Sequence, residues 1–240
     1  MSEAGDALRV WDRPIRDAEE GLSRLRWLLC EGALFAGDRR FEPIEAELYL
    51  HGPGHLDPTV HQHPEQGEPG RFYFHRVGRG FKGGSYKGLD LSWGGDGAFG
   101  GALIRGLREE DGGIVSGPSL CVDALLAACG MPDCASLHRC VVGRAVYAAG
   151  PLRLGVRPTP EQRAPLLTAR VGLPMGDGGA TRRWAAAALY RMTTYPELPK
   201  GRAESLAAMV AAGASDEEIT ARLGVRAGTV GRVRAGLASD

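Results

Sequence analysis

Two carboxylates and an aromatic ring alternate with apolar residues in one short stretch of the chain. In residues 41–50, FEPIEAELYL, the side chains of Glu45, Glu47 and Tyr49 stand between apolar ones. This period of two predicts a strand with one buried face, and glutamate is a poor strand former that an ordinary exposed face would not favour. Because a carboxylate can activate water as a general base, we interpret the polar face as the floor of an active site. A solvated face beside a loop is the alternative interpretation.

The strands predicted to follow carry further polar and aromatic side chains, at Tyr73, His75, Asp90 and Arg105. Aromatic rings beside a carboxylate could hold a nucleobase that has been turned out of a duplex. The carboxylate could then direct water onto the sugar as a glycosidic bond breaks through an oxocarbenium-like transition state. We therefore expect these four residues to gather around the two carboxylates.

Four of the six histidines lie in one loop, at His51, His55, His61 and His63, with Asp57 among them. Imidazole and carboxylate groups suit zinc or another borderline metal, so a metal-dependent hydrolase built on this loop is one interpretation. The spacing matches no standard zinc signature, which favours a rigid loop whose histidines line a polar cleft.

A third cluster combines Cys129, Cys134 and Cys140 with His138. Four such residues within twelve positions could hold structural zinc. Their spacing is looser than that of paired CxxC motifs, and small buried cysteines are the commoner explanation. We therefore expect no metal and no other cofactor, and the odd total of five cysteines indicates reduced thiols.

The composition is that of a globular protein without a bilayer span. The chain has 240 residues, of which 43% are hydrophobic, and its formal net charge is zero. No apolar run is long enough to cross a membrane, and the mixed N-terminal segment MSEAGDALRVWDRP lacks the apolar core of a secretory signal. We expect a cytoplasmic, nucleoid-associated protein that binds nucleic acid through local patches and not by its overall charge.

Periodicity and turn residues predict both strands and helices around these side chains. Residues 17–31 and 120–129 are predicted to be helical, with Ser119 as the N-cap of the second helix. Residues 183–192 fit either a strand or a helix. The predicted strands are 33–37, 41–50, 71–77, 86–93, 102–107, 145–149 and 152–156, with a loop over 51–70.

The last forty residues are rich in alanine and lack aromatic side chains. Ser215 and Glu218 form a capping-box pattern that opens a helix over residues 216–223. Helices are also predicted over 203–212 and 227–237. This order is typical of a helix-turn-helix, whose last helix enters the major groove.

Arginines on and beside the last predicted helix, at Arg226, Arg232 and Arg234, would supply positive charge for a DNA backbone. A plain helical bundle that docks on the main domain or on a partner is the alternative.

These patterns together predict an α+β protein. We expect a single mixed, mainly antiparallel sheet, barrel-like in form, with flanking helices and a small all-α helix-turn-helix at the C-terminus. The predicted divisions are an N-terminal arm at 1–15, a catalytic domain at 16–198 and a DNA-binding module at 199–240.

The order of the motifs resembles that of the alkyladenine (3-methyladenine) DNA glycosylase family. The family's strand V-E-T-E-A-Y-L is similar to IEAELYL at 44–50, and the resemblance extends over residues 15–196. Further similar segments follow in the family's order: PGRFY at 69–73 after the loop, LDLS at 89–92 for M-N-I-S, LIRGL at 103–107 for L-L-R-A-L, VSGPSLC at 115–121 for C-S-G-P-S-K-L-C, ARVG at 169–172, and Trp184 with 189–191 for the closing W…RFY.

The resemblance implies a role for each matching residue. Glu47 matches the glutamate that activates water, and Arg105 matches the arginine near that water and the phosphate of the flipped nucleotide. Tyr49 matches an aromatic ring that stacks on the flipped base. His61 is similar to a loop histidine that contacts the base, and His75 falls where a second stacking tyrosine is expected.

Two departures from the family's pattern bear on the substrate. Asp90 replaces a pocket asparagine, and a carboxylate there would attract amino or cationic groups and repel a carbonyl. The stretch at 78–84 replaces the segment that carries the family's intercalating tyrosine, which leaves Phe81 as the candidate wedge. These changes imply a bulky or hydrophilic modified base, such as one from invading phage DNA.

The resemblance implies a DNA glycosylase without a cofactor, whose partner is double-stranded DNA and which needs no membrane and no obligatory protein partner. No lysine is predicted to lie where it could form a Schiff base, so we expect an abasic site without strand cleavage. A non-catalytic DNA-binding regulator is the alternative, beside the metal-dependent hydrolase based on His51–His63. The residues expected to contact the DNA backbone are Arg76, Arg79, Lys82 and Lys87.

Overall fold

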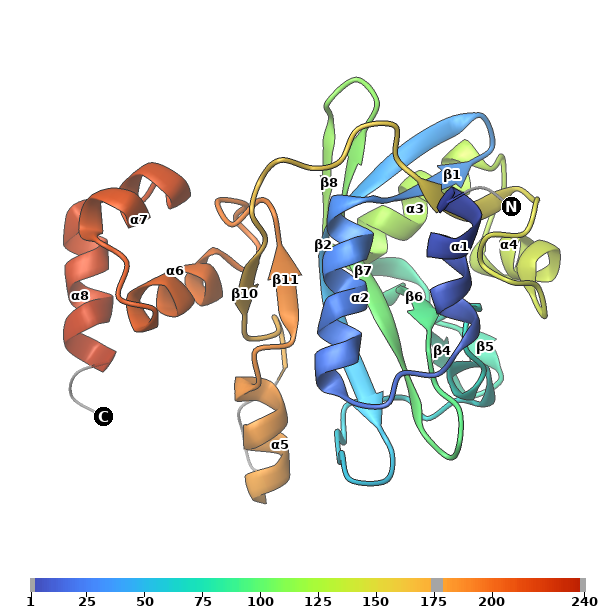
Figure 1. The fold of residues 1–240 in the computed structure, drawn as a ribbon, viewed down its shortest axis with the longest axis horizontal. Coiled ribbons are helices and arrows are strands. Elements are labelled where there is room, and N and C mark those ends of the chain that lie inside the picture. The colour runs from blue at the N-terminus through green and yellow to red at the C-terminus, as the bar shows by residue number, and fades with distance from the viewer. Residues whose placement is uncertain (1–2, 174–178, 238–240) are drawn as a thin grey trace.

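One large antiparallel sheet forms the centre of the protein, with helices packed against it and a three-helix unit at one side (Figure 1). The computed structural model describes residues 3–173 and 179–237. The strands of this sheet are β1 (Gly32–Ala36), β2 (Arg39–His51), β3 (Phe72–Phe74), β6 (Leu89–Ser92), β7 (Phe99–Glu109), β8 (Ile114–Ser116), β9 (Leu152–Val156), β10 (Leu166–Thr168) and β11 (Arg191–Thr193).

Strand β2 is the hub of the sheet. It pairs with β7 along almost its whole length, with β11 on its other side, and with β1 at its start. The main path runs β10-β11-β2-β7-β6-β3, and β9 extends the sheet beyond β1 while β8 pairs with β7. Every pairing among the described strands is antiparallel, and the sheet stays open.

The predicted α+β class is therefore confirmed, with one antiparallel sheet, flanking helices and a C-terminal all-α unit. The expected closure towards a barrel does not occur among the described residues. The helices are α1 (Glu3–Arg9), α2 (Ala18–Cys30), α3 (Pro118–Ala128), α4 (Cys134–Val141), α5 (Gly179–Ala187), α6 (Arg202–Ala211), α7 (Asp216–Leu223) and α8 (Ala227–Leu237), with short 3-10 turns at Val10–Asp12, Pro64–Gly67 and Gly84–Tyr86.

The apolar face of β2 packs against helices. Ala46 and Leu48 lie in the main hydrophobic core, which also takes residues from α2, α3 and α4. Helix α2 begins where Asp17 accepts a hydrogen bond from the backbone N–H of Glu20, a regular N-cap. Among residues 3–173 and 179–237, no helix has both the length and the apolar character needed to cross a membrane.

Three local predictions were wrong. Ser119 does not cap α3, because Gly117 is the N-cap, Pro118 opens the helix, and the Ser119 hydroxyl donates to the Gly84 carbonyl. The stretch at 145–149 forms turns and no strand. The stretch at 71–77 divides into β3 and β4 (Arg76–Val77), and β4 pairs only with β5 (Gly80–Phe81) in a separate hairpin.

Residues 134–141 form helix α4, which the sequence patterns did not predict. The undecided stretch at 183–192 contains both alternatives, because α5 ends at Ala187 and β11 begins at Arg191.

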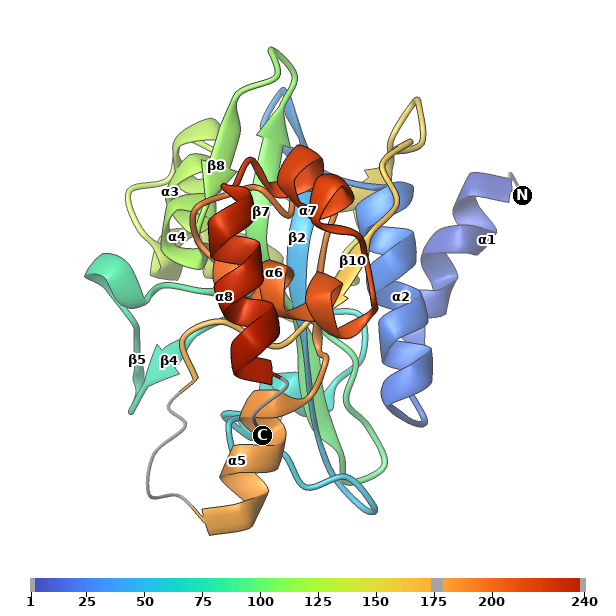
Figure 2. The same cartoon turned by 90° about the vertical axis from the view of Figure 1, so that its left-hand side faces the viewer.

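The C-terminal helices α6, α7 and α8 have a small hydrophobic core of their own, formed by Leu206, Met209, Val210, Ile219, Leu223 and Val230. Ser215 is the N-cap of α7, as predicted, and accepts a hydrogen bond from the backbone N–H of Glu218, which is one of the two hydrogen bonds of a capping box. Leu166 of β10 packs against this core, so the three helices contact the edge of the sheet. Figure 2 shows α6, α7 and α8 grouped together in front of the central strands.

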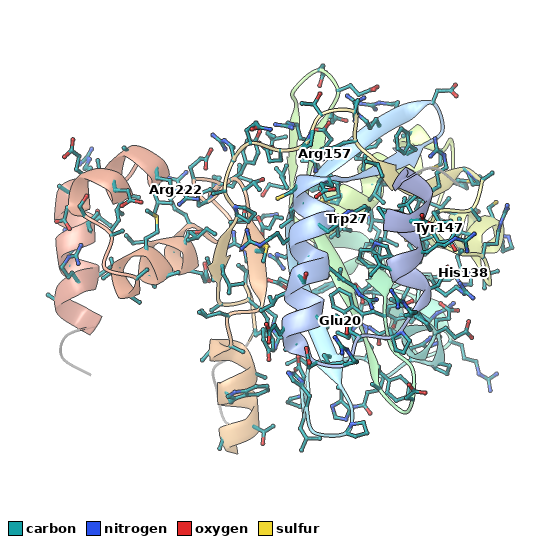
Figure 3. The ribbon with its side chains drawn as sticks, viewed as in Figure 1. Glu20, Trp27, His138, Tyr147, Arg157 and Arg222 are labelled. Atoms are coloured by element: carbon teal, nitrogen blue, oxygen red, sulfur yellow. The ribbon has the colours of Figure 1, made fainter. Side chains whose placement is uncertain are left out.

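Two arginines join the three-helix unit to the main body. Arg222 of α7 donates a hydrogen bond to the Ala164 carbonyl (Figure 3). Arg191 of β11 donates to the Gly201 carbonyl at the start of α6, at 3.2 Å. Gly201 has a left-handed φ of +86°, and a Cβ there would lie 2.4 Å from Nη2 of Arg191.

We expect Gly201→Ala to destabilise the protein more than Gly213→Ala does. Both glycines have left-handed φ angles, +86° and +77°, so each substitution carries a backbone strain of about 1–2 kcal/mol. Only the first adds a clash with a buried guanidinium, because no atom lies within 4 Å of a Cβ at Gly213. Chemical denaturation measures both variants, and equal losses of unfolding free energy would contradict the expected role of Arg191.

Candidate active site

The two carboxylates of β2 are buried and not solvated. The side chain of Glu45 is 2% exposed and that of Glu47 is fully buried. This rules out the alternative of a solvated strand face beside a loop. A buried charge has to be paired or hydrogen-bonded to be tolerated, so the partners of these two acids define the site.

Two buried arginines balance the two acids. Nε of Arg105 lies 3.0 Å from Oε1 of Glu45 and 3.3 Å from Oε1 of Glu47. Nε of Arg191 lies 2.8 Å from the same Glu45 oxygen. The resulting network holds two carboxylates and two guanidinium groups, so its formal charges cancel within the buried site.

A β-bulge directs Arg105 towards the acids. In the pairing of β2 with β7, Glu45 lies opposite Gly106 and Ala46 lies opposite Ile104, so Arg105 has no partner residue in β2. An extra residue of this kind redirects its side chain. The strands approach closely at Gly106, where a Cβ would lie 3.1 Å from the Cβ of Glu45, so a glycine suits this position.

Glu47 is surrounded by hydrogen-bond donors. Its Oε1 accepts the backbone N–H of Val171 at 2.8 Å, and its Oε2 accepts the Tyr49 hydroxyl at 3.0 Å and Nη1 of Arg105 at 3.4 Å. Burial raises the pKa of Glu47, against the opposing charge of Arg105. Burial by itself would lower the pKa of Arg105, but the carboxylates of Glu47 and Glu45 outweigh it and raise that pKa. The donors are those that an ionised carboxylate needs.

A cavity of about 230 Å³ lies beside this network. Four of the predicted site residues meet at its wall: Tyr49, His61, His75 and Asp90. The remaining lining residues are Thr59, Val60, Gln66, Lys82, Val171, Gly172 and Leu173.

Glu47 itself does not line the cavity. Tyr49 and Val171 both contact its carboxylate and both line the cavity, so they separate the acid from the open space. Arg170 packs on Tyr49: its Cζ lies 4.6 Å from the centroid of the Tyr49 ring, and its Nη1 pairs with the buried Asp57 at 2.6 Å.

Asp90 is held between two donors at the cavity wall. His75 Nε2 donates to Oδ1 of Asp90 at 2.8 Å, and Gln66 Nε2 donates to Oδ2 at 3.0 Å. The His75 ring approaches Gly88 so closely that a Cβ there would lie 2.5 Å from its Nδ1. Both Asp90 oxygens already accept protein N–H groups. This carboxylate therefore attracts an amino group of a base less strongly than the sequence analysis expected.

His61 joins the cavity to a layer of rings behind it. Burial lowers the pKa of His61 to about 4, so its imidazole is neutral near pH 7. Nζ of Lys82 lies 3.0 Å from Nε2, and Nδ1 lies 3.1 Å from the Tyr73 hydroxyl. An ammonium group only donates, so Nε2 accepts and Nδ1 carries the proton. Tyr73 is fully buried and stacks on His63, and it does not line the cavity.

Phe81 also lies away from the cavity wall. Its ring is half-buried against the main core, and the Arg76 guanidinium lies 4.2 Å above it. Just after the 78–84 stretch, the side chain of Tyr86 is 77% exposed.

The residues predicted to contact the DNA backbone differ in whether their charge is already paired within the protein. Arg76 is paired with Glu65 at 2.7 Å, and Lys87 is paired with Asp123 at 2.8 Å. Arg79, by contrast, is exposed at the turn of the β4–β5 hairpin.

The histidines of the loop point to different partners. His51 contacts the Asp57 carbonyl, His55 contacts Tyr190, and His61 contacts Lys82 and Tyr73. Within the described residues, no three His, Cys, Asp or Glu side chains are arranged to hold a metal ion.

The cysteine cluster is likewise dispersed. The thiols of Cys129 and Cys140 donate to the carbonyls of Pro151 and Ser136, and His138 pairs with Glu65.

Sequence patterns missed several residues that build this site. Arg191 and Arg170 form its buried ion pairs, and Gln66 and Val171 line the cavity. Val171 and Arg170 belong to the ARVG segment, which was recognised as a motif and not assigned a role. Lys82 was predicted to contact a DNA backbone and not to line the cavity.

Comparisons with known proteins give one limited similarity. No family model matches the chain. The chain is 36% identical over 108 residues to an uncharacterized protein of Acanthamoeba polyphaga mimivirus, an alignment that covers 39% of this chain and 50% of the viral protein. The chain thus spans about half the length of the curated relative that it matches.

We expect Glu45→Gln to destabilise the fold strongly. The substitution leaves Arg105 and Arg191 buried with one carboxylate between them, and breaking a buried pair costs about 3–5 kcal/mol. The control is Glu109→Gln, whose carboxylate pairs with the half-exposed Arg39 and contributes at most about 1 kcal/mol. Denaturant titrations measure both variants, and similar small losses would contradict the structural role of Glu45.

Proposed function

We propose that this protein is a DNA glycosylase of the alkyladenine type, which turns a modified base out of the duplex and hydrolyses its N-glycosidic bond. The observation that carries the proposal is the meeting of Tyr49, His61, His75 and Asp90 at one cavity, with Glu47 and Arg105 directly behind Tyr49. These positions match the family's site in order, and they derive from separate parts of the chain.

In the proposed reaction, the flipped base enters the cavity and stacks against the rings of Tyr49 and His75. Glu47 directs a water molecule onto C1′ of the deoxyribose, and the charge of Arg105 stabilises the ionised carboxylate. Because the Tyr49 hydroxyl occupies Oε2 of Glu47, this step requires Tyr49 to move so that water reaches the carboxylate. Val171 then continues to orient the acid through its N–H.

The cavity bears on the class of base. Its volume of about 230 Å³ lies below the roughly 300–1,000 Å³ of sites for drug-sized ligands. The wall carries the amide of Gln66, the carboxylate of Asp90 and the imidazole of His61. We therefore favour a hydrophilic modified base over a bulky one, whether it arises from damage or from invading DNA.

The C-terminal helices are proposed to add DNA affinity. Arg226 and Arg232 are exposed, and neither pairs with a carboxylate in the part of the chain that the structure describes. Arg234 pairs with Asp216 at 2.7 Å and donates to the Ala214 carbonyl. The first two arginines are therefore the better candidates for phosphate contacts.

We expect Glu47→Gln to abolish base release while DNA binding is largely kept. Removing a general base lowers the rate by roughly 100-fold or more. Mass spectrometry of bases released from differently modified duplexes measures the activity, and thermal unfolding with a DNA-binding titration serves as the control for an intact fold. Glu109→Gln is the matched variant outside the site. Base release that survives in folded Glu47→Gln protein would overturn the proposed role of Glu47.

A non-catalytic DNA-binding regulator is the second candidate. It is favoured by one observation, namely that Glu47 is fully buried and does not line the cavity. Under this alternative the ion-pair network serves only to stabilise the fold. The wild-type protein would then bind duplex DNA and release no base from any modified substrate.

We expect the double substitution Arg226→Ala with Arg232→Ala to weaken DNA binding and to reduce its salt dependence. Each lost phosphate contact lowers the slope of log affinity against log salt by about 0.9. The control is Arg16→Ala, which removes a highly exposed arginine of the main body. An unchanged slope in the double variant would contradict a role of α8 in DNA contact.

A further inference from the structure

One of the few lysines of the chain lies at the wall of the cavity. The sequence contains three lysines, at Lys82, Lys87 and Lys200. Lys82 lines the cavity together with Tyr49 and His75. Lys87 is held by the carboxylate of Asp123 at 2.8 Å, and Lys200 donates to the Ser116 carbonyl.

The surroundings of Lys82 differ from those of an ordinary surface lysine. Among the described residues its ammonium group forms no ion pair with a carboxylate, and its one hydrogen-bond partner is Nε2 of His61 at 3.0 Å. The imidazole is neutral because burial lowers the pKa of His61 to about 4. This hydrogen bond directs Nζ to the cavity wall, where no carboxylate of the described residues holds it.

From this geometry we propose that Lys82 is the nucleophile of a second activity, the cleavage of DNA at abasic sites. The proposal rests on the proposed function for the origin of the abasic sugar, because removal of the base empties the cavity and leaves C1′ at its mouth. It replaces the expectation that strand cleavage is absent, which assumed that no lysine lies near the site.

The reaction balances without an added oxidant or reductant. The open-chain abasic deoxyribose carries an aldehyde at C1′. The Lys82 ammonium group passes one proton to solvent water, and the lone pair that this frees on Nζ adds to that carbon. The former carbonyl oxygen takes up protons and leaves as water, which yields a protonated imine between Nζ and C1′.

Strand cleavage follows from the acidity of the carbon beside this imine. Solvent water takes a proton from C2′, which gives an enamine. Its electron pair forms the C2′–C3′ double bond as the C3′–O bond breaks. The phosphate leaves with the electrons of that bond. Water then hydrolyses the conjugated imine, which restores the Lys82 amine and releases an unsaturated aldehyde.

A phosphate contact is the simpler role for a lysine near DNA, and substitution by arginine separates the two roles. Lys82→Arg keeps the positive charge and the capacity to bind phosphate, but a guanidinium does not form a Schiff base under these conditions. The matched control is Lys200→Arg, which changes a lysine outside the cavity in the same way.

The experiment supplies the product of base removal directly. The full-length protein is incubated with a duplex that already contains one abasic site, in the presence of sodium cyanoborohydride, which reduces a protein–DNA imine to a stable cross-link. We expect a cross-linked species with wild-type and Lys200→Arg protein, mapped to Lys82 by peptide mass spectrometry. In Lys82→Arg we expect the cross-link to be lost, because a guanidinium does not form the imine, with binding to the same duplex retained.

Absence of a cross-link in the wild-type protein, or a cross-link that persists in Lys82→Arg or maps to the N-terminal amine, would overturn the proposal. Because the substrate bypasses base release, these outcomes are independent of the base-release assay. If the protein releases bases but forms no cross-link, the proposed function stands and this inference fails. If it forms the cross-link but releases no base, this inference stands and the proposed function fails.

Discussion

The buried carboxylate of Glu45 is the constraint on which the rest of the structure depends. One of its oxygens accepts both Arg105, from the neighbouring strand β7, and Arg191, from β11 on the other side of β2. Charged groups are tolerated in the interior only when each finds a partner. The network therefore fixes three strands relative to one another and holds Arg105 beside Glu47.

The same network extends to the C-terminal helices. Arg191 also donates to the Gly201 carbonyl and to the Ser205 hydroxyl of α6, so the start of the three-helix unit is attached to the back of the proposed active site. In the proposed function, a unit that contacts DNA and the strand that carries the general base thus share one buried arginine. The arrangement keeps the two parts that are proposed to contact DNA in a fixed relation without a long linker.

The cavity and the acid are adjacent but separate, which is the main chemical feature of the site. Tyr49 links them, because its ring lines the cavity and its hydroxyl is bound to Glu47. Its other neighbour is Arg170, which is fixed by the buried Asp57. A side chain in this position can control whether water reaches the carboxylate. Lys82 also lies at the cavity wall, and it is the group proposed to act after base removal.

The sequence by itself determined the local structure wherever periodicity and capping were strong. The strand at 41–50, the helix at 17–31 and the three C-terminal helices follow from spacing and from caps such as Asp17 and Ser215, since these depend only on neighbours along the chain. The grouping of His75 and Asp90 with Tyr49 was anticipated from the side chains of the predicted strands, and His61 was added through a resemblance to a family. Only the tertiary structure decided the bulge that directs Arg105, the partnership of Glu45 with Arg191, the placement of Lys82 at the cavity and of Phe81 away from it. Each of these depends on pairing between residues distant in the chain, and no local pattern encodes which buried charges will meet.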